Sequence, residues 1–351
     1  MINIYVDSDT AKDLTKMIDN EIGTGLALCA KVFCIQGQLD QANAFLMEAE
    51  KYKPAGLFIQ KAKYYWKQKK CLQALKLLTY NCEELRKRPG NANNPDLAKG
   101  LLMIARYNAE AAIVDDKKNR GMFDMALVPE VDREKAYLCY ADYLDRIIMK
   151  VPEINTIHVD KVAEVLKAYG NCLKFGSTHV LQSLPRFLQI WFDATMPRAF
   201  GGSNRTSFNS SNNATLNALV RGLSGTITSS QFYTAYSTLV SRICHPCTEV
   251  FGILKGIIAK LLSDYPKQSF WYVVYAMKNK LPNANERLKD ILRSVPKENL
   301  AVEEFSCFID RILELSKVNE SYQNVLVKKI NDMLLRMKSQ LLMPLQQNLM
   351  I

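Results

Sequence analysis

Apolar residues recur at spacings of three and four along most of the chain, a pattern typical of helices that bury one face. The pattern is clearest from Phe232 to Ile243 and again from Val250 to Leu262. No segment shows a convincing alternation with the period of two expected for a half-buried strand. Prolines divide the chain into pieces of helix length, because proline lacks a backbone donor and disfavours helix in the residue before it. The sequence therefore predicts an all-α protein.

A repeat of 32 residues lies within the segment from Gly25 to Arg88, where residues 38–46 return as residues 70–78. An alanine occupies the matching position in both copies, and larger apolar side chains follow three and four residues later. Since a small residue lets two helices approach closely, and the period is near that of tetratricopeptide repeats, we expect an α-solenoid of antiparallel helix pairs. The expected pairs join helix 24–36 to helix 38–50, and helix 55–69 to helix 71–87.

Further helices are expected beyond this repeat, at the boundaries that apolar periodicity and prolines indicate. They cover about 95–114, 131–150, 158–175, 178–195, the two apolar stripes named above, three segments separated by Pro266, Pro282 and Pro296, and 320–342. A run of Gly, Ser and Asn at 201–215 is typical of a flexible loop or a boundary between helical blocks. The chain is thus divided into an uncertain segment 1–24, a first repeat block 25–200, the loop 201–215 and a second repeat block 216–342.

Positive charge is concentrated in one part of the chain. The 351 residues carry 46 Lys and Arg against 35 Asp and Glu, a net charge of +11. The segment from Lys51 to Arg88 contains eleven basic residues against Glu83 and Glu84, so 11 − 2 = +9 of that charge lies there. The candidate binding patch comprises Lys61, Lys63, Lys67, Lys69 and Lys70, interleaved with Tyr64, Tyr65 and Trp66.

Two interpretations of this patch stay open. Basic residues beside aromatic rings can bind single-stranded nucleic acid through phosphate contacts and base stacking. Alternatively, the aromatic residues belong to the core of the repeat and the lysines form a solvated face. An acidic protein partner suits the patch as well as nucleic acid does.

Motifs for catalysis are missing from the sequence. There is no phosphate-binding glycine loop, no dinucleotide fingerprint, no nucleophile elbow and no kinase catalytic loop. With three histidines and no nucleophile pattern beside any of them, we assign no catalytic and no cofactor-binding residue. Cys244-His245-Pro246-Cys247 is the one metal-like motif, but a structural zinc site needs four ligands and the next cysteine is Cys307. We therefore predict no metal site.

The remaining sequence features bear on where in the cell the protein is located. Nine cysteines, an odd number scattered over apolar helical faces, favour a reducing compartment. No segment is apolar for the 18 to 20 residues that a membrane span needs, so we expect no membrane association. The first residues are acidic and resemble no secretory signal.

A collinear series of segments resembles the FAT region of the ATR-like phosphatidylinositol 3-kinase-related kinases. The resemblance covers about residues 25–351, with residues 1–24 and the Asn-rich loop matching least. The strongest match is residues 231–245, with the sequence QFYTAYSTLVSRICH. The other matching segments are 62–78, 175–176, 182–188 with Trp191, 249–251, 257–260, 265–268, 343–346 and 350–351.

The resemblance implies a fold and a role. FAT helices in this family curl around the kinase domain as a clamp, support a homodimer and help to position an ATRIP-like regulatory subunit. The full-length enzymes phosphorylate Ser/Thr-Gln sites in nuclear signalling of DNA damage and replication stress. Their kinase and FATC domains are absent from this chain, so no catalytic residue carries over, and residues 343–351 correspond to the link that precedes the kinase domain. ATP and Mg are expected only for that absent domain.

The leading hypothesis is therefore a non-catalytic FAT scaffold of an ATR-like Ser/Thr protein kinase. The alternative is a free-standing basic helical-repeat protein that binds nucleic acid or an acidic partner through the lysine patch.

Overall fold

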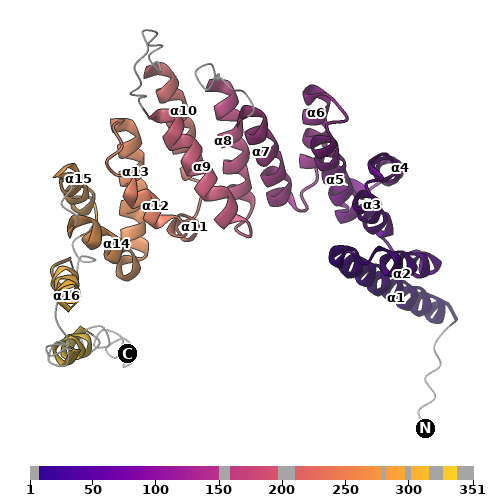
Figure 1. The fold of residues 1–351 in the computed structure, drawn as a ribbon, viewed down its shortest axis with the longest axis horizontal. Helices are drawn as coiled ribbons and strands as arrows, with labels where there is room; N and C mark the ends of the chain where they lie inside the picture. Colours follow the sequence, from indigo (N-terminus) through magenta and orange to yellow (C-terminus); the bar gives the residue numbers. More distant parts are fainter. Residues whose placement is uncertain are drawn as a thin grey trace. The chain divides into compact units, whose positions relative to one another are not determined.

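The computed structural model describes residues 8–149, 159–196, 210–278, 282–296, 302–315 and 327–337. These residues form helices joined by short connections, and no strand occurs among them. The chain divides into two compact units, Met1–Ile157 and His158–Ile351. The all-α class and the helical-repeat architecture predicted from the sequence are confirmed (Figure 1).

The first unit consists of helix pairs in which each odd-numbered helix contacts the next odd-numbered one. This arrangement places α1, α3, α5 and α7 along one face of the stack. The helices are α1 (Ser8–Gln36), α2 (Leu39–Tyr52), α3 (Leu57–Lys67), α4 (Cys71–Lys87), α5 (Pro95–Ala111), α6 (Asp116–Leu127) and α7 (Arg133–Met149), with a 3₁₀ turn η1 (Asn91–Asn93) before α5. Helix α1 begins well before residue 24, so much of the segment that the sequence left uncertain is helical.

The repeat predicted from the sequence has a direct structural counterpart. Ala42 on α2 and Ala74 on α4 are both fully buried, at the point where each helix packs on its partner in the hairpin. Leu46 and Leu78, four residues further on, are buried beside them. The two copies therefore bury the same face, as their 32-residue offset requires.

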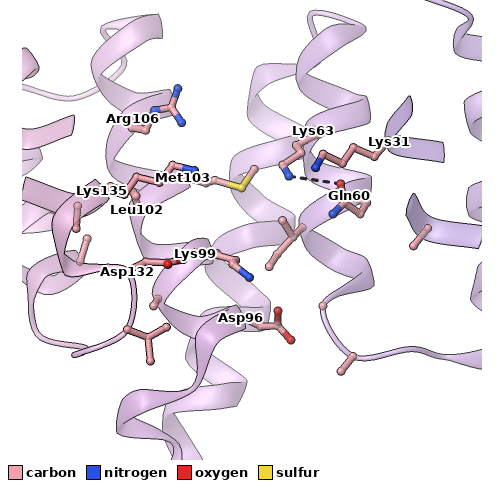
Figure 2. A pocket seen from close by; sticks show the side chains of 18 of the residues that line it. Lys31, Gln60, Lys63, Asp96, Lys99, Leu102, Met103, Arg106, Asp132 and Lys135 are labelled. Carbon is pink, nitrogen blue, oxygen red and sulfur yellow. Dashed lines mark hydrogen bonds between the residues drawn. The ribbon is translucent and has the colours of Figure 1, made fainter. Parts of the chain in front are cut away.

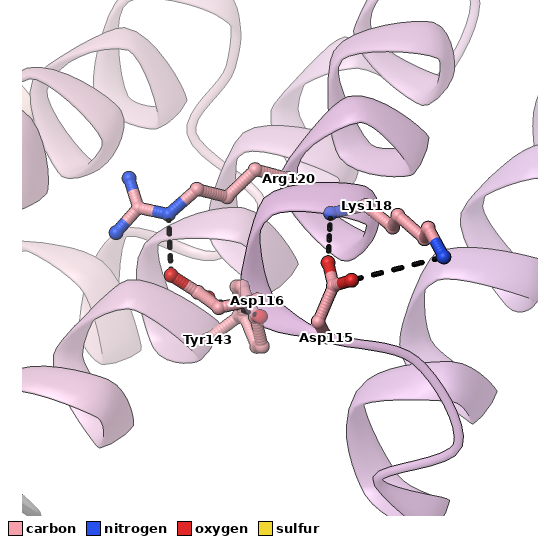
Figure 3. Close-up of polar contacts among 5 residues, drawn as sticks. All are labelled: Asp115, Asp116, Lys118, Arg120 and Tyr143. Atoms are coloured by element: carbon pink, nitrogen blue, oxygen red, sulfur yellow. Dashed lines mark hydrogen bonds and ion pairs between the residues drawn. The ribbon is translucent and has the colours of Figure 1, made fainter.

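Helix α6 was not expected from the sequence, because it is mostly polar and its apolar periodicity is weak. Its start is held by specific polar contacts (Figure 3). Asp115 caps the helix by accepting from the backbone N–H of Lys118 at 2.7 Å. The Tyr143 hydroxyl, on α7, donates to Asp116 at 2.6 Å, and Asp116 also pairs with Arg120 at 2.9 Å. A cap and one bond to the next helix thus define an element that hydrophobic spacing alone does not reveal.

The second unit contains shorter and less regular helices. They are α8 (Val159–Phe175), α9 (Val180–Thr195), α10 (Ser210–Ser224), α11 (Ser229–Tyr233), α12 (Tyr236–Ser241), α13 (Thr248–Asp264), α14 (Pro266–Lys278), α15 (Pro282–Arg293) and α16 (Val302–Leu315). Residues 327–337 are also helical, within the helix expected at 320–342. Pro185 lies inside α9, so proline does not end a helix there.

The division between the two units differs from the one expected at residues 201–215. Helices on both sides of that segment belong to the second unit, since α10 packs on α8 and α9. The segment is also shorter than expected, because α10 already begins at Ser210. Residues 197–209 lie outside the described residues.

The apolar stripe from Phe232 to Ile243 is buried as expected, but it forms two short helices and not one. The chain turns at Ala235, and the preceding Thr234 hydroxyl donates to the Gln231 carbonyl at 2.7 Å. The Gln231 side chain, itself buried, donates to the carbonyls of Leu173 and Gly176 at 2.8 Å each, and so satisfies the end of α8. The Gln231 side chain therefore has a structural role.

The link predicted at 343–351 lies outside the described residues. Among the helices that the structure does describe, none has the length and hydropathy needed to cross a bilayer.

Substitution of two helical glycines by valine is expected to have opposite outcomes. A side chain at Gly100 on α5 would overlap the sulfur of Cys82 and approach Phe58, whereas one at Gly121 on α6 would meet open space. Gly100→Val should lower the free energy of unfolding by about 1–3 kcal/mol through overpacking. Gly121→Val should leave it unchanged or slightly higher, because valine loses less backbone entropy than glycine. Urea denaturation compares the pair, and equal effects at both positions would contradict the packing described here.

Candidate binding surface and buried polar network

The five lysines of the predicted patch do not share one surface. Lys61 and Lys63 are two residues apart on α3 and hence point to opposite sides of the helix. Lys61 pairs with Glu50 of α2 at 2.6 Å. Lys63 instead lines a cavity between α1, α3, α5 and α7, and donates to Gln60 at 3.4 Å. Lys67, Lys69 and Lys70 are exposed at the end of α3 and in the turn to α4.

The aromatic residues of the patch pack within the first unit. The Trp66 indole stacks on the Tyr107 ring of α5, with ring centroids 3.8 Å apart and an interplanar angle of 6°. Tyr64 is buried, and its hydroxyl accepts from the Gln68 amide. One face of Trp66 is thus occupied by the protein itself. This geometry favours the interpretation in which the rings belong to the core of the repeat.

The cavity that contains Lys63 gathers cations from four different helices (Figure 2). Its volume is about 410 Å³. Buried apolar side chains such as Leu102 and Met103 contribute to its lining, and Asp96 and Asp132 are its two acidic groups. The cavity cations are Lys31 of α1, Lys63 of α3, Lys99 and Arg106 of α5, and Lys135 of α7.

Of these five cavity cations, the sequence analysis identified only Lys63. A signal for one more was present, because Lys31 precedes Lys63 by the 32 residues of the repeat. Leu28 and Gln60, which also line the cavity, show the same offset. The 32-residue offset does not relate the other three cations, Lys99, Arg106 and Lys135, to Lys31 or Lys63. They are brought together by the packing of α5 and α7.

The cavity is electrostatically unbalanced. Burial lowers the pKa of Lys63, and the nearby charges of Lys31, Lys135, Lys99 and Arg106 lower it further. Among the described residues, none of these cations forms an ion pair, whereas Lys61 and Lys255 each have a carboxylate within 2.8 Å. Lys63 is half-buried, whereas the other four cations are exposed, so solvent screens their charges.

A second polar cluster in the second unit runs from the buried Trp191 and Asn217 to the exposed Glu249. The Trp191 indole N–H donates to Asn217 at 2.9 Å, and the Asn217 amide donates to Glu249 at 2.9 Å. These bonds link α9, α10 and α13. Arg287 of α15 donates to the carbonyls of Ile243 and His245 and lies over the Phe251 ring at 4.5 Å.

His245, in the Cys-His-Pro-Cys motif, is buried in the same region. Its Nδ1 accepts from the backbone N–H of Cys247 at 3.2 Å, which leaves Nε2 as the protonated nitrogen, 3.4 Å from the Phe192 carbonyl. This pattern belongs to a neutral ring. Burial lowers the pKa of His245, and the charges of Arg242 and Arg287 lower it further.

The motif is thus part of the connection between α12 and α13. Cys247 is the residue before α13, and Pro246 precedes Cys247, so the proline lies just before the first turn of the helix. All nine cysteines are free thiols. Within the described residues, no group of three or more His, Cys, Asp and Glu side chains is placed to hold a metal ion.

Comparisons with known proteins agree on one class of protein. Residues 215–315 match the family model of HEAT repeats in ATR-like serine/threonine-protein kinases. The serine/threonine-protein kinase ATR of Drosophila melanogaster is 26% identical over 295 residues, which cover 80% of this chain and 11% of the relative. Protein kinase rad3 of Schizosaccharomyces pombe is 25% identical over 302 residues, covering 78% of this chain and 13% of the relative.

The fold also resembles that of a solved kinase of this kind. A solved structure of the FAT and kinase domain of CtTel1 superposes with a TM-score of 0.62 over 83% of this chain and 23% of that one, at 12% identity. Fold and sequence thus both resemble the helical repeats of phosphatidylinositol 3-kinase-related kinases. Within this class of kinases, the matches support an ATR-like segment of the FAT region, which confirms the resemblance seen in the sequence. The chain spans about a tenth of the curated relatives that it matches, and its matched region is the helical repeats of these kinases and not their kinase domain.

The stability of the second unit is expected to fall as the solution is acidified. Because the folded pKa of His245 lies below its unfolded value of about 6.5, the unfolded state binds more protons below that pH. The contribution of His245 to the free energy of unfolding is therefore complete above pH 6.5 and is lost as the pH falls through the folded pKa. Urea denaturation at pH 7.5, 6.5 and 5.5 should show this loss, and His245→Asn should reduce it. An unchanged pH dependence in the variant would contradict the assignment.

Loss of the Asn217 amide is expected to destabilise the second unit. Asn217→Leu leaves the buried Trp191 indole N–H without its acceptor, which should cost about 1–3 kcal/mol. Ala218→Leu, which adds the same side chain at the next, exposed position of α10, should cost much less. Urea denaturation followed by tryptophan fluorescence measures both, and equal losses would show that the bond is unimportant.

Proposed function

We propose that this chain is the non-catalytic FAT scaffold of an ATR-like Ser/Thr protein kinase that acts in DNA-damage and replication checkpoint signalling. In this role the helices clamp the kinase domain of the longer protein and provide surfaces for other proteins. The observation that carries the proposal is the match to ATR-like kinases along about four-fifths of the chain. The FAT fold, recognised in a solved structure that also contains a kinase domain, supports it.

The physical character of the second unit suits a clamp. A clamp has to hold its shape while presenting a continuous surface, and stacked helices supply such a surface. Hydrogen bonds between Trp191, Asn217 and Glu249 tie three helices together. Fully satisfied polar networks of this kind specify a single arrangement. The unit is therefore suited to hold one shape while it contacts other proteins.

The partners follow from the same proposal. We assign to the scaffold the kinase domain of the longer protein, an ATRIP-like regulatory subunit and a second copy in a homodimer, all in the nucleus. We assign ATP and Mg to the kinase domain and none to this chain. Binding of nucleic acid by the lysine patch stays the alternative, and the stacking of Trp66 on Tyr107 removes one ring face that such binding would use.

Chemical cross-linking of the longer protein tests the clamp. Lys260, Lys267 and Lys289 are exposed on α13, α14 and α15 and can react with an amine-specific cross-linker. We expect links from these lysines to the kinase domain in the native protein, and loss of these links after mild denaturation. Mixing isotopically light and heavy protein separates links within one copy from links across a homodimer. If the three lysines link only to other helical repeats, the clamp proposal is wrong.

A further inference from the structure

A groove in the first unit combines exposed apolar side chains with two arginines. Helix α5 supplies its floor, the end of α6 supplies one wall, and the end of α4 with the turn that follows supplies the other. Its volume is about 350 Å³. The groove, called the arginine groove below, is lined chiefly by Leu97 and Leu101 of the floor, Met125 and Val128 of the α6 wall, and Arg86 and Arg88 of the opposite wall.

The α6 wall presents apolar surface to solvent. Met125 is 37% exposed and Val128 is 66% exposed. They are three residues apart, a spacing that brings two side chains to the same side of a helix. Single exposed apolar residues are common, but these two lie beside the buried leucines of the floor and form one apolar face with them. This face suits an apolar side chain of a partner.

The opposite wall carries positive charge without a counterion. Within the described residues, neither Arg86 nor Arg88 has a carboxylate at ion-pair distance, whereas their neighbour Lys87 pairs with Glu84 at 2.7 Å. No acidic side chain lines the groove in the described part of the chain. Both guanidinium groups are exposed, and each can donate two parallel hydrogen bonds to a carboxylate. This wall therefore favours an anionic group.

Hydrogen bonds hold the two walls in place. The Asn91 side-chain N–H donates to the Leu85 carbonyl at 3.1 Å, which fixes the turn after α4. The Glu130 backbone N–H donates to the Asn93 side-chain oxygen at 3.0 Å, which joins η1 to the residues after α6. The groove is thus formed before a ligand binds, which lowers the entropic cost of binding.

The two walls together restrict the kind of occupant. A small inorganic anion would leave the apolar wall in water, and an entirely apolar segment would leave both arginines unpaired. A nucleic-acid strand needs aromatic faces for stacking, and within the described residues no aromatic ring lines the groove. A peptide that carries an apolar side chain between carboxylates matches both walls.

We propose that the arginine groove binds a short acidic segment of another protein. An apolar side chain of the segment packs between the α6 wall and the floor, and neighbouring carboxylates pair with Arg86 and Arg88. Arginine and methionine are both enriched in protein interfaces. The apolar anchor provides affinity and the arginines orient the segment. The proposal rests on the scaffold role, to which it adds one class of partner, and it does not involve the clamp.

Fluorescence anisotropy with three labelled peptides tests the proposal on the 351-residue chain. The probe is the peptide DEDLLEDE. Its controls are DEDSSEDE, which lacks the apolar anchor, and KRKLLKRK, which reverses the charge. We expect the probe to bind at one site, more weakly as salt is added, and each control to bind at least about tenfold more weakly. Equal binding of the probe and DEDSSEDE, or no binding of the probe, would overturn the proposal.

A pair of double variants tests the arginine wall. Arg86→Gln with Arg88→Gln should weaken probe binding by about tenfold or more, because both carboxylate contacts are lost. Lys67→Gln with Lys70→Gln removes the same charge near the start of α4, about 25 Å away at 1.5 Å per residue, and should weaken binding by less than about twofold. All four side chains are exposed, so the fold is retained. Equal weakening would show that only net charge matters and would overturn the proposal.

A pair of single variants tests the apolar wall. Met125→Ser should weaken probe binding by about fivefold or more, because the apolar anchor loses part of its contact surface. Met47→Ser changes another exposed methionine, on α2, and should leave binding unchanged. The same loss in both variants, or none in either, would contradict insertion of the anchor at the α6 wall.

Photo-cross-linking locates the peptide on the unchanged chain. A probe with photo-leucine at its two central positions should give adducts within residues 86–91, 97–101 or 125–129. Adducts confined to other parts of the chain, such as α1, whose apolar side chains are also exposed, would overturn the proposal. Either result leaves the clamp proposal untouched, because the clamp is tested with lysines of the second unit.

Discussion

Close approach of paired helices at small residues is the constraint on which the first unit depends. A single amphipathic helix pair cannot bury both of its apolar faces, so each pair needs the next one. Ala42 and Ala74, both fully buried, allow the hairpins to close. Gly100 extends the same principle to α5, where even a methyl group would overlap Cys82. These small residues therefore set how closely α2, α4 and α5 approach their neighbours.

The second unit uses polar bonds where the first relies on regular packing. Its helices α11 and α12 are short, and short helices have a high proportion of backbone groups without intrahelical partners. Gln231 satisfies two carbonyls at the end of α8, and Arg287 satisfies two more before α13. These side chains replace the hydrogen bonds that longer helices would make for themselves. The buried neutral state of His245 belongs to the same arrangement.

Much of this architecture could be predicted from the sequence, and the exceptions have physical causes. Long helices with strong apolar periodicity, such as α5 and α13, lie close to the predicted ranges. Helix α6 escaped prediction because a cap at Asp115 and a bond from Tyr143 define it. Helix α10 escaped because its first turn is built from serine and asparagine, residues that equally suggest a loop. Neither the cap, the bond from Tyr143 nor a polar first turn leaves an apolar periodicity in the sequence.

The candidate site shows the same division between local and tertiary information. The excess charge counted along the sequence lies between Lys51 and Arg88, but such a count does not state which face of a helix carries the charge. Lys61 and Lys63 differ by two residues and face different environments, one neutralised by Glu50 and one exposed to four other cations.

A solenoid converts spacing along the chain into position on a face, since residues one repeat apart lie side by side on successive helices. Lys31 and Lys63 meet for this reason. A charge that recurs with the repeat accumulates on one face of the stack, where repulsion grows with each added copy unless a counterion binds. The repeat that builds the core of the first unit therefore also brings Lys31 and Lys63 to one cavity, and the packing of α5 and α7 adds the other cations.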